Sequence, residues 1–288
     1  MRRPDLSTLR DRRVLITGAA SGIGAATAVA AAAEGAQLFL TDIDADLLAR
    51  TAAGIGDAVR LATPCDVSDL PAVRALAQNT LAGHGPMDVV MNVAGIAAWG
   101  TVENLEHRHW RSMIEVNLMG PIHVIECFVP QMIAAGRGGH LVNVCSAAGL
   151  IALPWHAAYS ASKYGLRGVS DVLRFDLRPH GIGVSLVCPG GVATPLAGTV
   201  QIAGVDQAGE RFGRLRAGFE RRAVTPERAA RSILDGVHRN RYLVYTSNDI
   251  RVVNQVQRKA EPLYVLGMRV FHALANRALP MPTAAPAR

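Results

Sequence analysis

Three residues in the middle of the chain have the types and spacing needed for proton transfer at an alcohol or ketone oxygen. Tyr159 and Lys163 are four positions apart, so a helix would place both on one face, about one turn apart. An ammonium beside a phenol stabilises the phenolate and lowers a pKa that is ordinarily about 10. Ser146 can hydrogen-bond the same substrate oxygen. These residue types together predict general acid/base chemistry.

A glycine-rich segment near the start of the chain has the pattern of a phosphate cradle. The apolar run Val14–Ile16 leads into Thr17–Gly24, and a helical stretch follows. Glycines let the backbone turn sharply and approach a pyrophosphate, and the new helix points its free N–H groups at the phosphates. Such turns also occur for packing alone, but the place after a first strand favours dinucleotide binding. The expected cofactor contacts here are Gly18, Ser21, Gly22, Ile23 and Gly24.

An acidic residue follows the second apolar run at the distance expected for ribose recognition. Asp42 lies 24 residues after Gly18, where a carboxylate can accept hydrogen bonds from both adenosine ribose hydroxyls. The same charge would repel a 2′-phosphate, and no Lys or Arg lies beside it or in the glycine-rich loop. The sequence therefore favours NAD over NADP, although a solvated loop acid or a helix N-cap would also explain Asp42.

The elements that must position these residues alternate along residues 10–250. Nearly continuous apolar runs are typical of strands buried on both faces. They cover Arg13–Thr17, Gln37–Thr41, Val59–Thr63, Asp88–Asn92, His140–Cys145, Val184–Cys188 and Tyr242–Thr246. Helical stretches lie near Ile23–Glu34, Leu70–Ala82, Glu106–Ala134, Ala157–Arg178 and Pro226–Val237. This alternation predicts an α/β fold: a Rossmann-like, doubly wound parallel sheet of about seven strands with helices on both faces.

Composition excludes several other classes of protein. Half of the 288 residues are hydrophobic and 18% are charged, so the chain is not expected to be disordered. Four widely spaced cysteines form neither a disulfide scaffold nor a metal-ligand pattern, so we expect no metal site and a reducing, cytoplasmic location. No uninterrupted apolar run reaches 18 residues, which disfavours a membrane-spanning helix. The first apolar run is too short for a signal peptide.

Charge is concentrated late in the chain. The net charge is +7, and residues 205–260 hold twelve basic and six acidic residues. Little aromatic interleaving and no recognised motif accompany them, so we do not expect a nucleic-acid partner. Of the 30 basic residues only Lys163 and Lys259 are lysine. A compact ammonium and a planar guanidinium are not interchangeable beside a phenol, which makes the lysine at position 163 informative.

Taken in order, the motifs resemble those of the short-chain dehydrogenase/reductase family. The resemblance covers residues 10–250, and Ser146 precedes Tyr159 by the family's usual 13 residues. One departure is Val93, where the family commonly has a second Asn. The matching pieces are Thr17–Gly24, Asp66-Val67, Asn92–Gly95, Asn117, Ser146, Tyr159-x-x-x-Lys163 and Pro189-Gly190.

The resemblance implies hydride transfer at a nicotinamide ring and gives roles to individual residues. Tyr159 would be the general acid/base, Ser146 would position the substrate oxygen, and Lys163 would lower the Tyr159 pKa and bind the nicotinamide ribose. Asn117 would hold a water of a proton relay. Further cofactor contacts are implied for Asp66 and Val67 at the adenine, for Asn92, Ala94 and Gly95 beside the adenosine half, and for Pro189, Gly190, Val192 and Thr194 near the carboxamide.

Two segments lie outside the strand-helix alternation. The resemblance makes residues 195–222 a lid over the substrate, and its arginines would either grip an anionic group or form a solvated face. Residues 251–288 form a C-terminal helical extension beyond a single catalytic domain at 1–250. This amphipathic stretch could pack on the body, reach another subunit of a dimer or tetramer, or contact a membrane surface.

The sequence predicts a small-molecule substrate, and only a few residues indicate its chemical class. The side chains expected to wall the pocket are Trp99, Ile151, Leu153, Trp155, His156 and Leu196. They favour an apolar alicyclic, steroid-like or lipid-like alcohol or ketone. Two alternatives stay open at this stage: an NADPH-dependent carbonyl or 3-oxoacyl reductase, and a dinucleotide-binding sensor without turnover.

Overall fold

The computed structural model describes residues 4–195, 200–205, 207, 212–214, 217, 218, 221 and 223–278. Its central sheet has seven strands in the order β3-β2-β1-β4-β6-β7-β9, and all of its pairings are parallel. The strands are β1 Arg13–Thr17, β2 Gln37–Asp42, β3 Val59–Pro64, β4 Val89–Asn92, β6 Gly139–Val144, β7 Ile182–Cys188 and β9 Leu243–Tyr245. The predicted fold class is therefore confirmed, and each predicted strand is present within two residues of its expected ends. Strand order reverses between β1 and β4, which is where open α/β sheets bind ligands.

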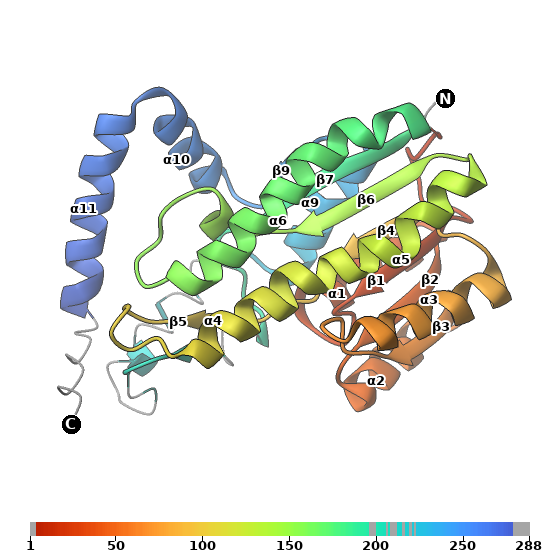
Figure 1. The fold of residues 1–288 in the computed structure, drawn as a ribbon, viewed down its shortest axis with the longest axis horizontal. Helices are drawn as coiled ribbons and strands as arrows, with labels where there is room; N and C mark the ends of the chain where they lie inside the picture. Colours follow the sequence, from red (N-terminus) through yellow and green to blue (C-terminus); the bar gives the residue numbers. More distant parts are fainter. Residues whose placement is uncertain are drawn as a thin grey trace.

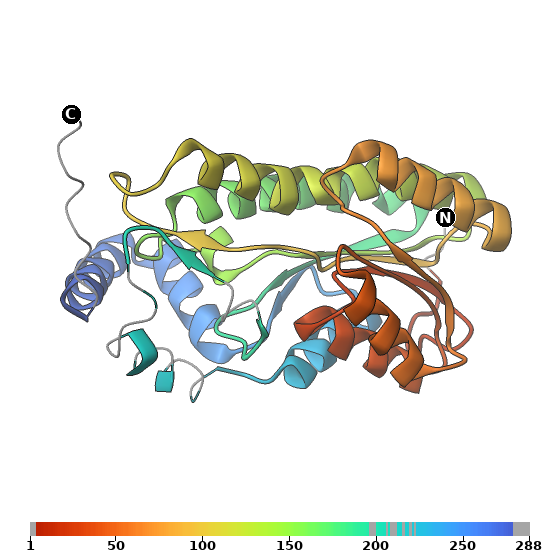
Figure 2. The ribbon, with the colours of Figure 1, turned by 90° about the horizontal axis from the view of Figure 1, so that it is seen from below.

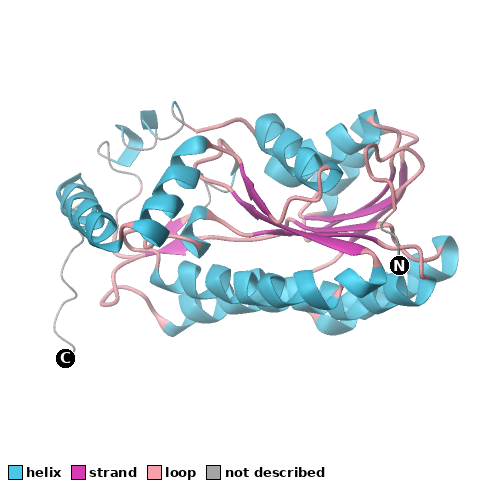
Figure 3. Cartoon of the chain, turned by 90° about the horizontal axis from the view of Figure 1, so that it is seen from above, coloured by secondary structure: helices cyan, strands magenta, loops and turns pink. Residues whose placement is uncertain are grey.

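The sheet is buried on both faces because its side chains alternate between two apolar layers. In β1, Val14 and Ile16 enter one core with Ile233, whereas Leu15 between them enters the opposite core with Phe128. Helices cover both layers, as the view from below shows (Figure 2). The opposite view shows the same three layers by element type (Figure 3). Burial on both faces explains why the strands are nearly continuous apolar runs in the sequence.

Helices α1, α2 and α9 cover one face, and α3, α5 and α6 cover the other (Figures 1 and 2). Their bounds are α1 Gly22–Ala33, α2 Ala45–Ile55, α3 Leu70–His84, α4 His107–Ile114, α5 Gly120–Ala135, α6 Ala157–Asp176 and α9 Pro226–His238. Helix α2 was not among the sequence predictions. The expected single helix at 106–134 is divided by a π-helical turn at Glu115–Met119. This 29-residue stretch is apolar and long enough to cross a membrane, yet Phe128 and Met132 pack in the core under the sheet.

The C-terminal extension folds as two helices at one end of the molecule (Figure 1). They are α10 Asn248–Lys259 and α11 Glu261–Ala278. A two-stranded parallel sheet lies nearby, formed by β5 Ala98–Trp99 and β8 Gln201–Ile202. Half of the predicted lid, including Leu196 and Arg211, lies outside the described residues. The division into a 1–250 domain and an extension stays a prediction, as does contact of α11 with a membrane or another subunit.

Candidate active site

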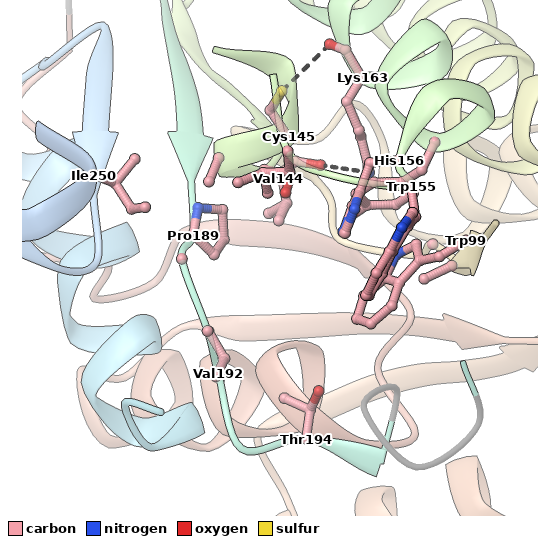
Figure 4. A pocket seen from close by; sticks show the side chains of 18 of the residues that line it. Trp99, Val144, Cys145, Trp155, His156, Lys163, Pro189, Val192, Thr194 and Ile250 are labelled. Carbon is pink, nitrogen blue, oxygen red and sulfur yellow. Dashed lines mark hydrogen bonds between the residues drawn. The ribbon is translucent and has the colours of Figure 1, made fainter. Parts of the chain in front are cut away.

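A cleft of about 440 Å³ opens at the carboxyl ends of β4, β6 and β7 (Figure 4). The loops after these strands form its floor. Other lining residues come from α1, from the start of α6, and from α10 and α11. The cleft therefore lies beside the reversal of strand order, where the first helix also begins. Among the predicted site residues, its lining includes Ile23, Gly95, Ser146, Tyr159, Lys163, Pro189, Gly190, Val192 and Thr194.

The predicted acid/base group and its two neighbours meet in this cleft. Ser146 follows β6, and Tyr159 and Lys163 lie one turn apart in α6. The Ser146 hydroxyl lies near enough to the Tyr159 phenol to favour the phenolate, and it accepts a hydrogen bond from the Ala148 N–H at 3.1 Å. The Lys163 ammonium lies 5.7 Å from the centre of the Tyr159 ring and donates to the Val144 carbonyl at 3.1 Å. The three side chains are thus held by fixed partners.

Burial changes the proton affinity of both ionisable groups in the cleft. It raises the pKa of Tyr159 from 10.0 to about 12, and the Ser146 hydrogen bond offsets part of this rise. Burial also lowers the pKa of Lys163. Burial thus outweighs any lowering of the Tyr159 pKa by Lys163, and that lowering stays a prediction. The physical reason is that desolvation opposes both charged forms, while the ammonium is engaged by the Val144 carbonyl and not by the phenol.

Asn117 lies in the π-helical turn between α4 and α5 and is fully buried. Its side-chain amide makes two hydrogen bonds to the backbone of Ile96, one to the N–H and one to the carbonyl, both 2.9 Å. A Cβ on Gly95 would lie 2.9 Å from the Asn117 oxygen and 3.5 Å from the Lys163 nitrogen. Asn117 thus fixes the loop after β4 beside Lys163. Its suggested part in a proton relay stays a prediction.

The glycine-rich loop has the shape that a pyrophosphate cradle needs. Gly18 has a φ of +67°, and a Cβ there would meet the Ala94 backbone at 2.7 Å. A Cβ on Gly24 would overlap the Gly18 carbonyl oxygen, so α1 can approach β1 only with glycine at this position. The N-cap residue Ser21 makes no side-chain hydrogen bond to the helix. The first N–H groups of α1 are therefore open to an anionic ligand.

The predicted acid at the ribose position is tied to this loop. Asp42 ends β2 and accepts hydrogen bonds from the N–H groups of Ala20 at 2.9 Å and Asp44 at 3.1 Å. Each carboxylate oxygen accepts one bond and retains capacity for a second. No ion pair to Asp42 occurs among the residues that the structure describes. The carboxylate therefore retains two acceptor positions beside the glycine-rich loop.

The adenine-side residues lie along the carboxyl ends of β3 and β4. Asp66 accepts hydrogen bonds from the Ser68 N–H and hydroxyl at 2.8 and 2.7 Å, and the Val67 carbonyl is bonded to the His123 ring at 2.9 Å. Asn92 donates to Asn143 at 2.9 Å, while its own side-chain oxygen is buried without a partner among the described residues. An unpaired buried acceptor is costly, so a ligand donor would be favourable here.

Thr17 joins the two halves of the cofactor region, although it was not among the predicted contacts. Its hydroxyl accepts hydrogen bonds from the Val93 and Ala94 N–H groups at 3.0 and 3.1 Å. The segment after β7 is fixed in a similar way, because the Ala193 N–H donates to Val224 at 2.9 Å. The predicted cofactor contacts at these strand ends are thus held in place by backbone hydrogen bonds. The glycine-rich loop, the uncapped N-terminus of α1 and the unpaired side-chain oxygen of Asn92 all fit a dinucleotide.

The outer part of the cleft is mostly apolar. Trp99, Leu153, Trp155 and His156 line it as predicted, whereas Ile151 packs in a core cluster with Cys145 and Leu186 instead. Ile250 of α10 and Phe271 and Ala275 of α11 also line the cleft, although they were not predicted. No short-range sequence signal connects those residues with the strand ends, so only the tertiary fold identifies them.

Helix α11 is attached to the loop before α6 by two side-chain hydrogen bonds. The Tyr264 hydroxyl accepts from the Ala152 N–H at 2.7 Å, and the Asn276 oxygen accepts from the Trp155 indole at 3.0 Å. Trp155 has a φ of +63°, a conformation that is uncommon for a bulky residue. Its backbone carbonyl accepts from the Gly100 N–H at 2.8 Å. These contacts hold Trp155 at the cleft.

The fold and the site define a nucleotide-dependent oxidoreductase of the α/β class, and comparisons with known proteins identify the family. Residues 12–203 match the family described as short chain dehydrogenase. SadH of Mycobacterium tuberculosis, named as an oxidoreductase, is 35% identical over 261 residues, which are 88% of this chain and 92% of SadH. The chain belongs to the short-chain dehydrogenase family.

Two further comparisons agree with that membership. The trans-4-hydroxycyclohexanecarboxylate dehydrogenase of Sinomonas cyclohexanicum is 37% identical over 194 residues, which are 65% of this chain and 74% of that protein. A short-chain dehydrogenase/reductase crystal structure from Burkholderia phymatum, in complex with NAD, superimposes with a TM-score of 0.81. It is 28% identical and covers 89% of this chain and 96% of its own.

Proposed function

We propose that this protein transfers a hydride between NAD(H) and a secondary alcohol or ketone, with Tyr159 as the general acid/base. One observation carries the proposal: Ser146, Tyr159 and Lys163 line one cleft, with the Lys163 ammonium 5.7 Å from the centre of the Tyr159 ring. The N-terminal end of α1 lies beside these residues, and the Ser21 side chain does not cap it. A proton-transfer group and a dinucleotide cradle are the two parts that such a reaction requires.

The nicotinamide, when bound, supplies the carbon that accepts or donates the hydride. The protein's own residues handle the oxygen and its proton. Ser146 holds the substrate oxygen beside Tyr159, and Tyr159 takes the proton during oxidation or gives it during reduction. Lys163 stabilises the phenolate that forms, because its ammonium lies 5.7 Å from the centre of the Tyr159 ring. The apolar outer walls exclude water from this exchange.

Asp42 supports a preference for NAD over NADP. Its carboxylate is bonded only to backbone N–H groups among the described residues, so no protein cation would balance a 2′-phosphate there. The relative crystallised with NAD agrees with this proposal without deciding it. Comparing kcat/KM for the two cofactors tests the preference. A strong preference for NADP(H) would contradict the electrostatic argument.

The substrate class that the cleft favours is an apolar, ring-bearing alcohol. Trp99, Leu153, Trp155 and Phe271 provide the surface against which such a ring would pack. The Sinomonas relative is named for a hydroxylated cyclohexane ring, which supports the same class. A cytoplasmic location and assembly into a dimer or tetramer stay predictions.

A dehydrogenase screen with a matched pair of variants tests the function. Alicyclic alcohols, sterols and hydroxyacyl thioesters would be offered with NAD and with NADP, and the reduced cofactor followed by its absorbance. We expect Tyr159→Phe to lose at least a thousandfold in kcat while it still binds NAD. Tyr164→Phe is the control, because Tyr164 lies in the same helix but is 40% exposed. Unchanged turnover in Tyr159→Phe would refute the mechanism. NAD binding without turnover of any alcohol would favour the sensor alternative.

A further inference from the structure

Two polar groups interrupt the apolar outer wall of the cleft. Trp99 of β5 and His156, the residue before α6, have ring centres 4.5 Å apart with planes inclined by 31°. Both rings line the cleft, and they lie close together in Figure 4. The His156 ring is also in edge-to-face contact with Tyr159, at 6.0 Å between centres. The pair therefore adjoins the reacting group on its substrate side.

The protonation of His156 follows from its hydrogen bond. Its Nδ1 is bonded to the Pro154 carbonyl, which can only accept, so Nδ1 carries the hydrogen. Burial lowers the pKa of His156 to about 4, so the ring is neutral at physiological pH. A neutral imidazole has one N–H group, and Nε2 is therefore a hydrogen-bond acceptor. It has no partner among the residues that the structure describes.

Trp99 carries a hydrogen-bond donor, whereas His156 carries an acceptor. Its indole Nε1–H is buried and has no acceptor among the described residues. A buried donor without an acceptor is uncommon and unfavourable, and a ligand that supplies the acceptor recovers that cost. The indole can only donate, whereas Nε2 of His156 can only accept. A hydroxyl group is the common substituent that accepts one hydrogen bond and donates another.

We propose that Trp99 and His156 form a binding subsite for a second hydroxyl group of the substrate, separate from the hydroxyl that reacts at Tyr159. The inference rests on the proposed function, because it assumes that the reacting oxygen lies at Ser146 and Tyr159. The His156 and Tyr159 rings are in contact, with centres 6.0 Å apart, so a hydroxyl bound at the pair would belong to the same small substrate as the reacting hydroxyl. The substrate class narrows accordingly from an apolar alcohol to an alicyclic diol or polyol.

A carboxylate would fit this pair less well than a hydroxyl. It could accept the Trp99 N–H, but it has no hydrogen to offer Nε2 of a neutral imidazole. The described lining of the cleft contains no arginine to balance its charge, and Lys163 is held by the Val144 carbonyl. The donor-acceptor pair thus separates hydroxyl from carboxylate substituents at the far end of the ring.

Three substrates that share one ring test the subsite. They are cyclohexanol, trans-1,4-cyclohexanediol and trans-4-hydroxycyclohexanecarboxylate, assayed with NAD in the wild-type protein. We expect kcat/KM for the diol to exceed that for cyclohexanol by about tenfold or more, beyond the factor of two for its equivalent hydroxyls. The carboxylate should be a poorer substrate than the diol. Equal kcat/KM for the diol and cyclohexanol, or a preference for the carboxylate, would overturn the proposal.

Variants assign the effect to the two rings. His156→Phe keeps an aromatic ring without the acceptor, and Trp99→Phe removes the donor. Each should lower kcat/KM for the diol by about tenfold, since one hydrogen bond to a buried neutral group is involved. The ratio of kcat/KM for the diol to that for cyclohexanol should therefore fall by about tenfold in each variant, whatever common loss the altered wall causes for both substrates. Trp110→Phe in α4 is the control. An equal loss on both substrates would show a merely structural role and refute the subsite.

A binding measurement keeps the inference independent of turnover. The indole N–H signal of Trp99 can be assigned in a ¹⁵N-labelled NMR spectrum by its loss in Trp99→Phe. We expect this signal to shift on addition of the diol to the NAD-saturated protein and to stay in place with cyclohexanol. If no alcohol is turned over, the proposed function fails, while a diol-specific shift still supports the subsite. A signal that never moves would refute it.

Discussion

The neutral state of His156 makes the protein sensitive to acid in a defined range. Burial lowers the pKa of His156 from 6.5 to about 4. The hydrogen bond to the Pro154 carbonyl raises this pKa, but its effect is the smaller of the two. The unfolded chain therefore binds this proton at a higher pH than the folded chain does. The stabilisation is complete above pH 6.5 and is lost as the pH falls toward 4. His156→Phe removes the titrating group and keeps the ring stacked on Trp99.

The size of the effect follows from the two pKa values. Between pH 7 and pH 5 the unfolded chain becomes almost fully protonated at this site, while the folded chain stays almost fully neutral. The linkage relation then gives a loss of about 2 kcal/mol in the free energy of unfolding. The His156→Phe variant lacks this loss, so its stability relative to wild type should improve by about 2 kcal/mol over the same interval.

Urea unfolding at a fixed protein concentration measures the difference. The free energies of unfolding of wild type and variant would be compared at several pH values by circular dichroism. Only the change of their difference with pH matters, so a constant offset from the altered side chain does not affect the result. Parallel curves, differing by a constant from pH 7 to pH 5, would refute the neutral His156 on which the hydroxyl subsite depends.

Three other expectations concern the cofactor loop, the acid/base group and the attachment of α11. Gly24→Ala places a Cβ on the Gly18 carbonyl oxygen and should destabilise the protein by about 3 kcal/mol with loss of NAD binding, measured by urea unfolding and titration. The control Gly54→Ala, with nothing within 4 Å of the added Cβ, should be neutral or stabilising. Equal losses of stability and NAD binding in the two variants would contradict the role of Gly24 in the cofactor loop. Because the Tyr159 pKa is raised to about 12, kcat/KM for alcohol oxidation should rise by up to about tenfold per pH unit between about pH 7 and 9, and a flat profile would argue against phenolate chemistry. Asn276→Leu removes the acceptor of the Trp155 indole and should raise KM for ring-bearing alcohols by about fivefold with kcat little changed, whereas Arg277→Leu, exposed on the same helix, should not.

The sheet and the chemical residues could be predicted because both depend on local patterns. Strands such as β1 and β7 are buried on both faces and read as apolar runs. Tyr159 and Lys163 are brought together by the period of one helix, so their spacing already implies their contact. The glycines at 18 and 24 are required by backbone contacts inside one loop. Each of these features is decided within a few residues of sequence.

The features that sequence reasoning missed depend on contacts between distant segments. Helix α2 carries an N-cap at Asp44 but buries only Leu48, so its apolar pattern is weak. Phe271 lines the cleft because α11 packs against a loop more than a hundred residues earlier. The raised Tyr159 pKa reflects burial in the folded protein, which a helical spacing cannot reveal. The π-helical turn at Asn117 likewise follows from the amide's bonds to Ile96.

One side of α11 faces the cleft and the other faces solvent. Substrate binding in the cleft is therefore coupled to association at the outer side of this helix. Phe271 and Ala275 line the cleft, while Leu263, Leu266, Val270 and Leu274 are each more than half exposed to solvent. Anything that covers the outer residues and favours the attached position of the helix also favours substrate binding. Thermodynamic reciprocity requires the substrate to strengthen that association by the same factor. For a second copy of the chain as the covering surface, substrate affinity would rise with protein concentration, so dilution series belong in any kinetic study of this enzyme.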